Sequence, residues 1–107
     1  MCERFILFTT PEKRSPYFQL DNIVDFAPRY NIAPTQTIPC IIHDIFGKRM
    51  MQLFHWGLIP YWAEDPSIGS RLMKARSETV ATKPSFRSAF NHRRCLIPTT
   101  GFFEWKR

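Results

Sequence analysis

The chain has 107 residues, of which 44% are hydrophobic and 15% aromatic, and its formal net charge is +6. This length allows one domain with a modest core, and the composition excludes a disordered chain. No apolar run approaches the roughly 18 residues of a membrane helix, and the apolar stretch near the start is too short and wrongly flanked for a secretory signal.

In chain order, the amino-terminal third predicts two short elements and then a loop. Arg4–Phe8 is an apolar strand candidate. Thr10-Pro11-Glu12 has the N-cap and first-turn residues of a helix, which Pro16 would interrupt. Pro28–Pro34 is bounded by prolines and predicts an extended loop rather than a regular element.

The middle of the chain predicts a β-hairpin. Ile38–Ile45 and Lys48–Leu58 are β-rich runs joined through Phe46-Gly47. Alternation in the second run indicates that both of its faces are partly covered. Pro60–Gly69 predicts a loop, and Leu72–Arg76 predicts a further strand.

The last third predicts one helix and two strands. Pro84 fits the first turn of a helix that has an apolar face. Cys95–Ile97 and Phe102–Trp105 predict strands around a turn at Pro98–Gly101. The fold class is therefore α+β, dominated by short antiparallel strands. Since the chain stops at Arg107 inside a strand pattern, we expect a truncated domain and a sheet left open to association with itself or with the remainder of the fold.

The positive charge is concentrated in one segment. Residues 71–94 hold seven Lys and Arg and one acid, whereas the rest of the chain holds eight basic and eight acidic residues. Two interpretations remain open. The segment is a solvated helix face, or it is a site for a polyanion such as nucleic acid, since phosphate neutralisation supplies most non-specific affinity.

The three cysteines, Cys2, Cys40 and Cys95, form no paired framework, which is typical of a reducing compartment. We expect a cytoplasmic protein, associated with the nucleoid if its source is bacterial. If Met1 is removed, Cys2 presents a thiol and an α-amine of pKa about 7.7–8.0 on adjacent carbons, a pair that closes an aldehyde into a thiazolidine ring. The alternative is a small buried residue that starts a strand.

Five stretches in order carry a resemblance: MCERF at 1–5, RYNIAP at 29–34, WGLIPYW at 56–62, ARSET at 75–79 and CLIPTTGFFEW at 95–105. Together they closely resemble the SRAP family, the SOS response-associated peptidase proteins that shield abasic sites in single-stranded DNA. The resemblance implies a strand-rich, barrel-like fold with a basic cleft for single-stranded DNA. It also implies a longer domain, of which residues 1–107 are the amino-terminal portion.

The resemblance assigns chemistry to three residues. It implies that Cys2 traps the ring-opened aldehyde of an abasic site, and that Glu104 moves protons during the capture. Arg76 matches an arginine that holds a DNA phosphate. Without the resemblance, Glu104 is a carboxylate at the rim of a strand, and Arg76 is a surface arginine or a partner for Glu78.

Four further residues match positions near DNA in the family. Trp62 and Tyr61 match aromatics that lie against DNA bases, and Asn31 and Pro34 match the loop beside the reactive end. The alternatives are core packing for Trp62 and a plain turn for the loop.

The sequence departs from the family pattern in three ways. Glu3 replaces a glycine, and its carboxylate favours the charged form of the adjacent amine. Lys74 replaces an asparagine that holds the sugar, and it could instead bind phosphate or form an imine with the aldehyde. None of the three histidines, His43, His55 and His92, matches the family's active-site histidine.

The leading hypothesis is therefore an abasic-site sensor that forms a covalent link to single-stranded DNA. Glu3 and Lys74 favour an alternative, a non-catalytic single-stranded DNA-binding module. A thiol peptidase or lyase-like activity is a third possibility that the missing histidine weakens. We expect no cofactor and no metal, since Cys40-x-x-His43 is a lone ligand pair.

Overall fold

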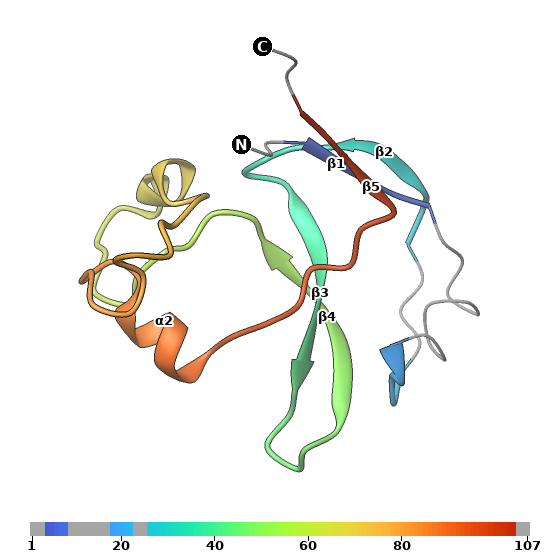
Figure 1. The fold of residues 1–107 in the computed structure, drawn as a ribbon, viewed down its shortest axis with the longest axis horizontal. Coiled ribbons are helices and arrows are strands. Elements are labelled where there is room, and N and C mark those ends of the chain that lie inside the picture. Colours follow the sequence, from blue (N-terminus) through green and yellow to red (C-terminus); the bar gives the residue numbers. More distant parts are fainter. Residues whose placement is uncertain (1–3, 9–17, 23–25, 105–107) are drawn as a thin grey trace.

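Residues 4–8, 18–22 and 26–104 are described in the computed structural model, and they form a strand-rich α+β fold with few helical residues (Figure 1). In chain order the elements are β1 (Arg4–Leu7), β2 (Arg29–Ile32), β3 (Thr37–His43), β4 (Arg49–His55), the 3-10 helix η1 (Pro66–Arg71), α2 (Arg87–His92) and β5 (Gly101–Phe103). The helix expected from Thr10 lies outside the described residues, as does Trp105.

The first strand is the central one of a three-stranded sheet. The order is β2-β1-β5, and β1 is antiparallel to both neighbours. Phe5 lies opposite Ile32 of β2 and Phe102 of β5. Since side chains alternate along a strand, Phe5 and Leu7 are buried on one face, as the expected strand at Arg4–Phe8 requires.

The strand β2 corrects the expectation of an irregular loop between Pro28 and Pro34. Both prolines flank the strand and neither lies inside it, so every residue of β2 retains an N–H group for pairing with β1. The two prolines therefore mark the ends of a β-strand rather than a loop.

The predicted hairpin is confirmed, and β3 and β4 pair along their whole length. Its turn has a local cause. The Asp44 carboxylate accepts hydrogen bonds from the N–H groups of Phe46 and Lys48, both at 2.8 Å. Gly47 adopts a φ of 78°, in the region that glycine enters without steric cost.

Two other expected strands are wrong or much reduced. Leu72–Arg76 forms no strand, because the Leu72 N–H bonds to Gly69 at the end of η1 while its carbonyl accepts from Leu58. The strand expected around Cys95 is reduced to one bridge, in which Leu96 pairs antiparallel with Ile41 of β3.

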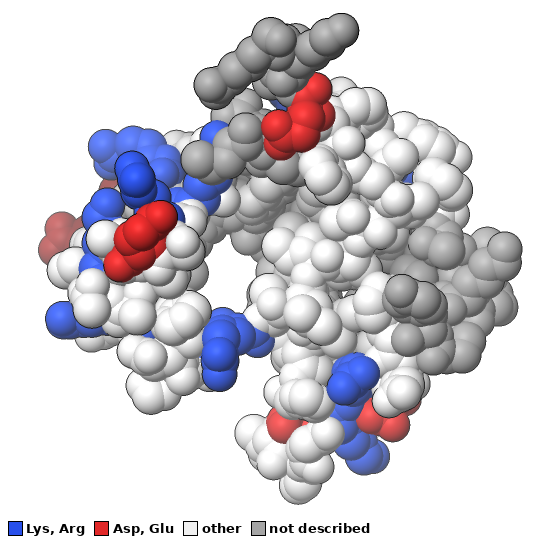
Figure 2. Space-filling model, viewed as in Figure 1, with Lys and Arg blue, Asp and Glu red and all other residues white. Residues whose placement is uncertain are grey.

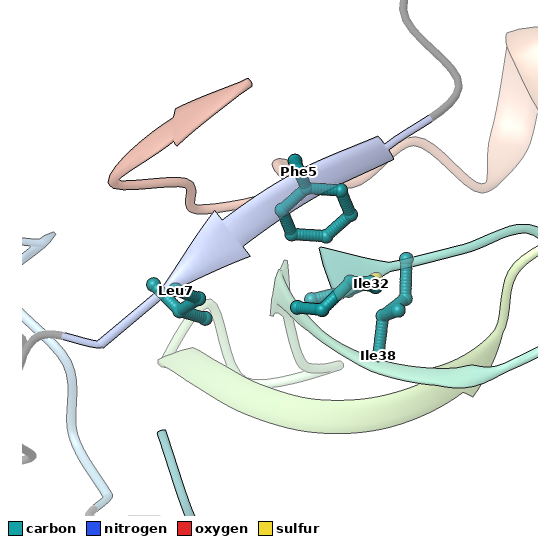
Figure 3. Close-up of a cluster of buried hydrophobic side chains, with 5 residues drawn as sticks. Phe5, Leu7, Ile32 and Ile38 are labelled. Carbon is teal, nitrogen blue, oxygen red and sulfur yellow. The ribbon is translucent and has the colours of Figure 1, made fainter. Parts of the chain in front are cut away.

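The core lies between β1, β2 and β3. Its cluster of buried side chains consists of Phe5, Leu7, Ile32, Ile38 and Cys40. In Figure 3 the labelled side chains converge on one another from β1, β2 and β3. Trp56 is half-buried and packs against this cluster.

Residues 58–94, called the basic lobe below, lie on the other side of the hairpin from the three-stranded sheet (Figure 1). The loop expected at Pro60–Gly69 ends early, because Asp65 caps η1 and Pro66 occupies its first turn. The helix expected near Pro84 begins only at Arg87.

A close backbone approach joins the lobe to the hairpin. Gly57 has a φ of 129°, and a Cβ atom there would lie 2.3 Å from the Gly69 carbonyl oxygen. Only glycine fits this contact. In the part of the chain that the structure describes, the sheets do not close into a barrel, and no helix has the length and hydropathy needed to cross a bilayer.

Candidate functional site

The candidate site is built around the start of β1. Cys2 lies outside the described residues, which begin two positions later at Arg4. The described residues around Arg4 are therefore the ones to compare with the predicted site.

Glu104 belongs to those surroundings. In the β1–β5 register, Arg4 lies opposite Phe103, and Glu104 follows directly. Glu104 is exposed to solvent. Strand pairing thus brings this carboxylate, at the far end of the sequence, to the end of the sheet where β1 begins.

The loop of Asn31 and Pro34 approaches from the other side of β1. Ile32 pairs with Phe5, so residues after Ile32 run alongside the beginning of β1. Asn31 is exposed and Pro34 is half-buried. β2 and β5 therefore place the loop and Glu104 on opposite sides of one strand.

Side-chain hydrogen bonds hold this loop. The Gln36 amide oxygen accepts from the Ala33 N–H at 3.0 Å and from the Arg29 guanidinium at 2.5 Å. The same guanidinium donates to the Thr37 carbonyl at 2.6 Å. Thr35, with a φ of 72°, donates its N–H to the Trp56 carbonyl at 2.8 Å. The loop is more constrained than a plain turn.

Trp56 connects β1 to the basic lobe. Its ring lies 5.4 Å from the Phe5 ring, centroid to centroid, and its indole N–H donates to the Met73 carbonyl at 3.4 Å. Lys74 comes next in the chain and is half-buried. The beginning of the basic segment is thereby fixed close to the first strand.

Arg76 is exposed on this segment. Its Nε atom lies 3.6 Å from a carboxylate oxygen of Glu78, and the two side chains are 80% and 68% exposed. An ion pair this open to water is weak, so it leaves Arg76 available to a stronger anion. In this structure Arg76 is both a surface residue and the ion-pair partner of Glu78, as the two alternatives stated.

Trp62 and Tyr61 lie at the surface. Trp62 is 49% exposed and Tyr61 is 83% exposed, so neither belongs to the core cluster. Trp62 borders a pocket of about 350 Å³ whose other lining residues are Ala63, Glu64, Asp65, Ser67, Ile68 and Arg71. Hydrogen bonds from Ser67 lower the pKa of the Asp65 carboxyl, which holds a negative charge beside Arg71. The pocket wall therefore carries both signs of charge.

The basic residues of 71–94 are spread over turns rather than along one helix face. Six of the seven are exposed, and only Arg87 lies within α2. Figure 2 shows the Lys and Arg side chains gathered on the basic lobe, with few carboxylates among them. The structure thus presents a cationic surface that begins next to Met73, whose carbonyl accepts the hydrogen bond from Trp56.

A metal site would need grouped His, Cys, Asp or Glu side chains. Among the residues the structure describes, no three His, Cys, Asp or Glu side chains are grouped as ligands. Cys40 and His43 are three positions apart on β3, so they point to opposite faces; Cys40 is buried and His43 is exposed.

No spacing in the sequence predicts a pairing of Cys40 with Cys95. The neighbouring Cys40 side chain lowers the pKa of Cys95 to about 7, whereas the neighbouring Cys95 and burial raise the pKa of Cys40. One exposed thiol and one buried thiol are thus adjacent, although they lie far apart in the chain.

The family model of the SOS response associated peptidase (SRAP) proteins matches residues 1–107. The chain belongs to the SRAP family. The abasic site processing protein YoqW of Bacillus subtilis is 44% identical over the whole of this chain and 49% of its own length. YedK of Escherichia coli is 29% identical over the whole chain and 49% of its own length.

Two further comparisons gave matches of lower identity. The abasic site processing protein HMCES of Xenopus tropicalis is 31% identical over 77% of this chain and 28% of its own length. A crystal structure of a Bordetella bronchiseptica protein shares the fold, with a TM-score of 0.71 at 22% identity over 92% of this chain and 48% of that one. The chain spans about half the length of the bacterial relatives it matches.

Proposed function

We propose that this chain takes part in processing abasic sites in single-stranded DNA, and that Cys2, once Met1 is removed, captures the exposed sugar aldehyde as a thiazolidine. The SRAP relatives from Bacillus subtilis and Xenopus tropicalis are named abasic site processing proteins, which supports the general activity. The covalent step through Cys2 is our extension of it.

The observation that carries the proposal is the pairing of β1. Its register with β5 brings Glu104 to the start of β1, and its register with β2 brings the loop of Pro34 there. Trp56 then ties Phe5 of β1 to the first residues of the basic segment. An aminothiol at position 2 would therefore have a carboxylate and a cationic surface in its neighbourhood.

The capture needs no outside reagent. The α-amine of Cys2 adds to the aldehyde carbon and gives a carbinolamine, which loses water to form an imine. The Cys2 sulfur then adds to the imine carbon, and its proton passes to nitrogen, which closes the five-membered ring. In this scheme the Glu104 carboxylate moves protons in the dehydration.

Lys74 offers a second nucleophile near the same surface. It follows Met73, whose carbonyl accepts the Trp56 N–H, and it carries an amine where the family pattern has an amide. In this proposal Lys74 binds phosphate, and an imine between Lys74 and the aldehyde is the competing outcome.

The test is incubation of the chain with a single-stranded oligonucleotide that contains one abasic site, followed by denaturing electrophoresis and intact mass. We expect an adduct heavier by the oligonucleotide minus one water. Cys2→Ser and a chain that retains Met1 should both lose it. Cys95→Ser is the matched control and should retain it. An adduct that survives in Cys2→Ser but not in Lys74→Ala would replace the thiazolidine with the lysine imine.

The exposed Trp62 and the basic lobe favour a second candidate, a non-catalytic single-stranded DNA-binding module. Base stacking on an aromatic ring tolerates any sequence, and phosphate neutralisation makes binding sensitive to salt. This candidate predicts equal binding of intact and abasic DNA, with no dependence on Cys2. A thiol peptidase remains a third proposal, and cleavage of a peptide blocked by Cys2→Ser would support it.

We also propose that residues 1–107 form the amino-terminal portion of one SRAP domain, and that a further segment of the fold covers the outer edge of β5. The bacterial relatives are about twice as long, and Phe102 and Phe103 are 64% and 53% exposed on that edge strand. Sedimentation should then show self-association of the 107-residue chain at micromolar concentration. A monomer with slowly exchanging amides in β5 would contradict this.

A further inference from the structure

We propose that Cys40 and Cys95 form a peroxide-reactive dithiol, a modification site in which Cys95 is oxidised first and then closes a disulfide with Cys40. The reaction uses neither Cys2 nor the DNA chemistry above. Its substrate class is a hydroperoxide, with hydrogen peroxide as the smallest member.

The backbone brings the two cysteines to one face. Ile41 and Leu96 exchange both of their N–H to carbonyl hydrogen bonds, at 2.8 and 2.9 Å, and form an antiparallel bridge. Cys40 precedes Ile41, and Cys95 precedes Leu96. In an antiparallel pair, the residues on either side of a bridge project to the face opposite that of the bridged residues. Cys40 and Cys95 are therefore diagonal neighbours on the same face.

The effect of each thiol on the pKa of the other indicates that this diagonal is a close one. Diagonal positions in a regular sheet lie about 7–8 Å apart, beyond the usual Cα separation of a disulfide, so bond formation needs a shift of the backbone. Here the bridge is isolated, and Cys95 lies outside any strand. The backbone at Cys95 can therefore move toward Cys40 without breaking a ladder of hydrogen bonds.

The two thiols differ in solvent exposure and in pKa, and a stepwise oxidation requires both differences. Cys95 is exposed, whereas Cys40 is 3% exposed within the core cluster. The interaction with Cys40 lowers the pKa of Cys95 to about 7. Arg93 and Arg94 directly precede Cys95 and add positive charge nearby. A solvent-accessible thiolate beside a second thiol is the usual arrangement of an oxidisable cysteine.

The chemistry balances with one peroxide. The Cys95 thiolate attacks a peroxide oxygen, the O–O bond breaks, and Cys95 becomes a sulfenic acid; the departing hydroxide takes up a proton to give water. The Cys40 sulfur, after loss of its proton, attacks the Cys95 sulfur. The S–S bond forms as the S–O bond breaks, and a second water leaves. Two thiols are oxidised by two electrons, and the peroxide is reduced to two waters.

The disulfide would tie β3 to the segment that leads into β5. Leu96 is otherwise attached to β3 by the single bridge, and five residues after it β5 begins to pair with β1. Oxidation would therefore fix the path of the chain between the basic lobe and the central strand. Reduction by a dithiol would restore the free state.

Tryptic mapping tests the proposal, because cleavage places each cysteine in a different peptide: Cys2 in 1–4, Cys40 in 30–48 and Cys95 in 95–106. The 107-residue chain is treated with one equivalent of hydrogen peroxide, unfolded in N-ethylmaleimide and digested. We expect the 30–48 and 95–106 peptides joined, at their summed mass minus two hydrogens, and separated again by dithiothreitol. The oxidised chain should also melt more than about 5 °C higher than the reduced chain.

Three variants keep the result interpretable. Cys2→Ser should form the same link. Cys95→Ser, at an exposed position, should leave Cys40 fully alkylated and the melting temperature insensitive to peroxide. Cys40→Ala should stop at a sulfenic acid on Cys95 that dimedone traps. A link through Cys2, Cys95 sulfinic acid beside an unmodified Cys40, or reaction of Cys95 no faster than free cysteine would each overturn the proposal.

Discussion

The indole ring of Trp56 packs against the phenyl ring of Phe5, with 5.4 Å between the ring centroids and 57° between the ring planes. On its other side the same indole donates its N–H to the Met73 carbonyl. One side chain therefore links the strand that follows Cys2 to the segment that contains Lys74. The relative position of β1 and the basic lobe depends on this link.

Replacing Trp56 should affect stability and DNA binding together. Trp56→Phe retains a ring against Phe5 but removes the N–H to Met73 and leaves a small void. We expect the free energy of unfolding to fall by about 1–2 kcal/mol, measured in urea, and affinity for single-stranded DNA to fall as well. Trp62→Phe, at an exposed ring, should change stability by less than about 0.5 kcal/mol. Equal stability losses in the two variants would contradict the role of Trp56.

The contact between Gly57 and Gly69 predicts a large difference between two glycine substitutions. Gly57→Ala places a Cβ atom 2.3 Å from the Gly69 carbonyl oxygen at a φ of 129°, and should cost more than about 2 kcal/mol of stability. Gly47→Ala is the matched control. Its φ is also positive, at 78°, but no atom lies within 4 Å of the added Cβ, so about 1 kcal/mol is expected. Thermal unfolding of the pair measures the difference, and similar costs would show that the close approach is not needed.

Arg76 should contribute one phosphate contact. Binding of single-stranded DNA is measured over a range of salt concentrations, and the slope of log K against log salt should become shallower by about 0.7 in Arg76→Ala. Lys48→Ala, at the exposed turn of the hairpin, should leave the slope unchanged. If both variants shift the slope equally, binding is diffuse and the basic lobe has no special part in it.

Glu104 should affect the rate of capture and not the binding of DNA. Glu104→Gln keeps the shape of the side chain but cannot take up a proton. We expect the formation of the covalent adduct with abasic DNA to slow by about 10²-fold or more, measured by quenched time points on denaturing gels. Affinity for intact single-stranded DNA should not change. An unchanged rate would assign Glu104 to the rim of the strand, without a chemical role.

The interaction between Cys40 and Cys95 gives the chain a dependence on pH. Because the pKa of Cys95 is lowered to about 7 from an ordinary value of 9.0, its alkylation by iodoacetamide should rise with a midpoint near pH 7. In Cys40→Ala the midpoint should move up, since the neighbouring thiol is absent.

The same shift affects stability, and its sign follows from linkage. Between pH 7 and 9 the folded chain holds fewer protons on Cys95 than the unfolded chain, so the free energy of unfolding should increase as pH rises through this window. This contribution is lost as pH falls through 7. Cys95→Ser should lack the increase, and identical pH profiles would show that the thiolate is not stabilised in the fold.

Local signals in the sequence predicted the elements that local interactions stabilise. The hairpin is confirmed because Asp44 and Gly47 encode its turn within a few residues. β1 is confirmed by its alternating side chains. β2 was missed, since only its pairing with β1 makes Arg29–Ile32 a strand, and the flanking prolines suggested a loop. The strand predicted at Leu72–Arg76 was wrong, because the backbone groups of Leu72 form hydrogen bonds with Gly69 of η1 and with Leu58 instead.

The arrangement of the candidate site was less predictable. The sequence motifs predicted Cys2, Glu104 and Pro34 as site residues. Only the strand order β2-β1-β5 shows that Glu104 and Pro34 lie on opposite sides of β1. The hydrogen bond from Trp56 to the Met73 carbonyl joins segments 17 positions apart, which no local pattern indicates. The Cys40–Cys95 pair also arises from a single long-range bridge, which no spacing rule detects.

The central position of β1 has a consequence for the order of assembly on the ribosome. β1 is synthesised first, yet its second partner, β5, begins only at Gly101. Contacts between positions this distant in the chain form slowly, so the middle strand waits half-paired until β5 has been synthesised. The pairing around Arg4 is therefore completed only after Gly101–Phe103 has left the ribosome, long after Arg4 itself has emerged.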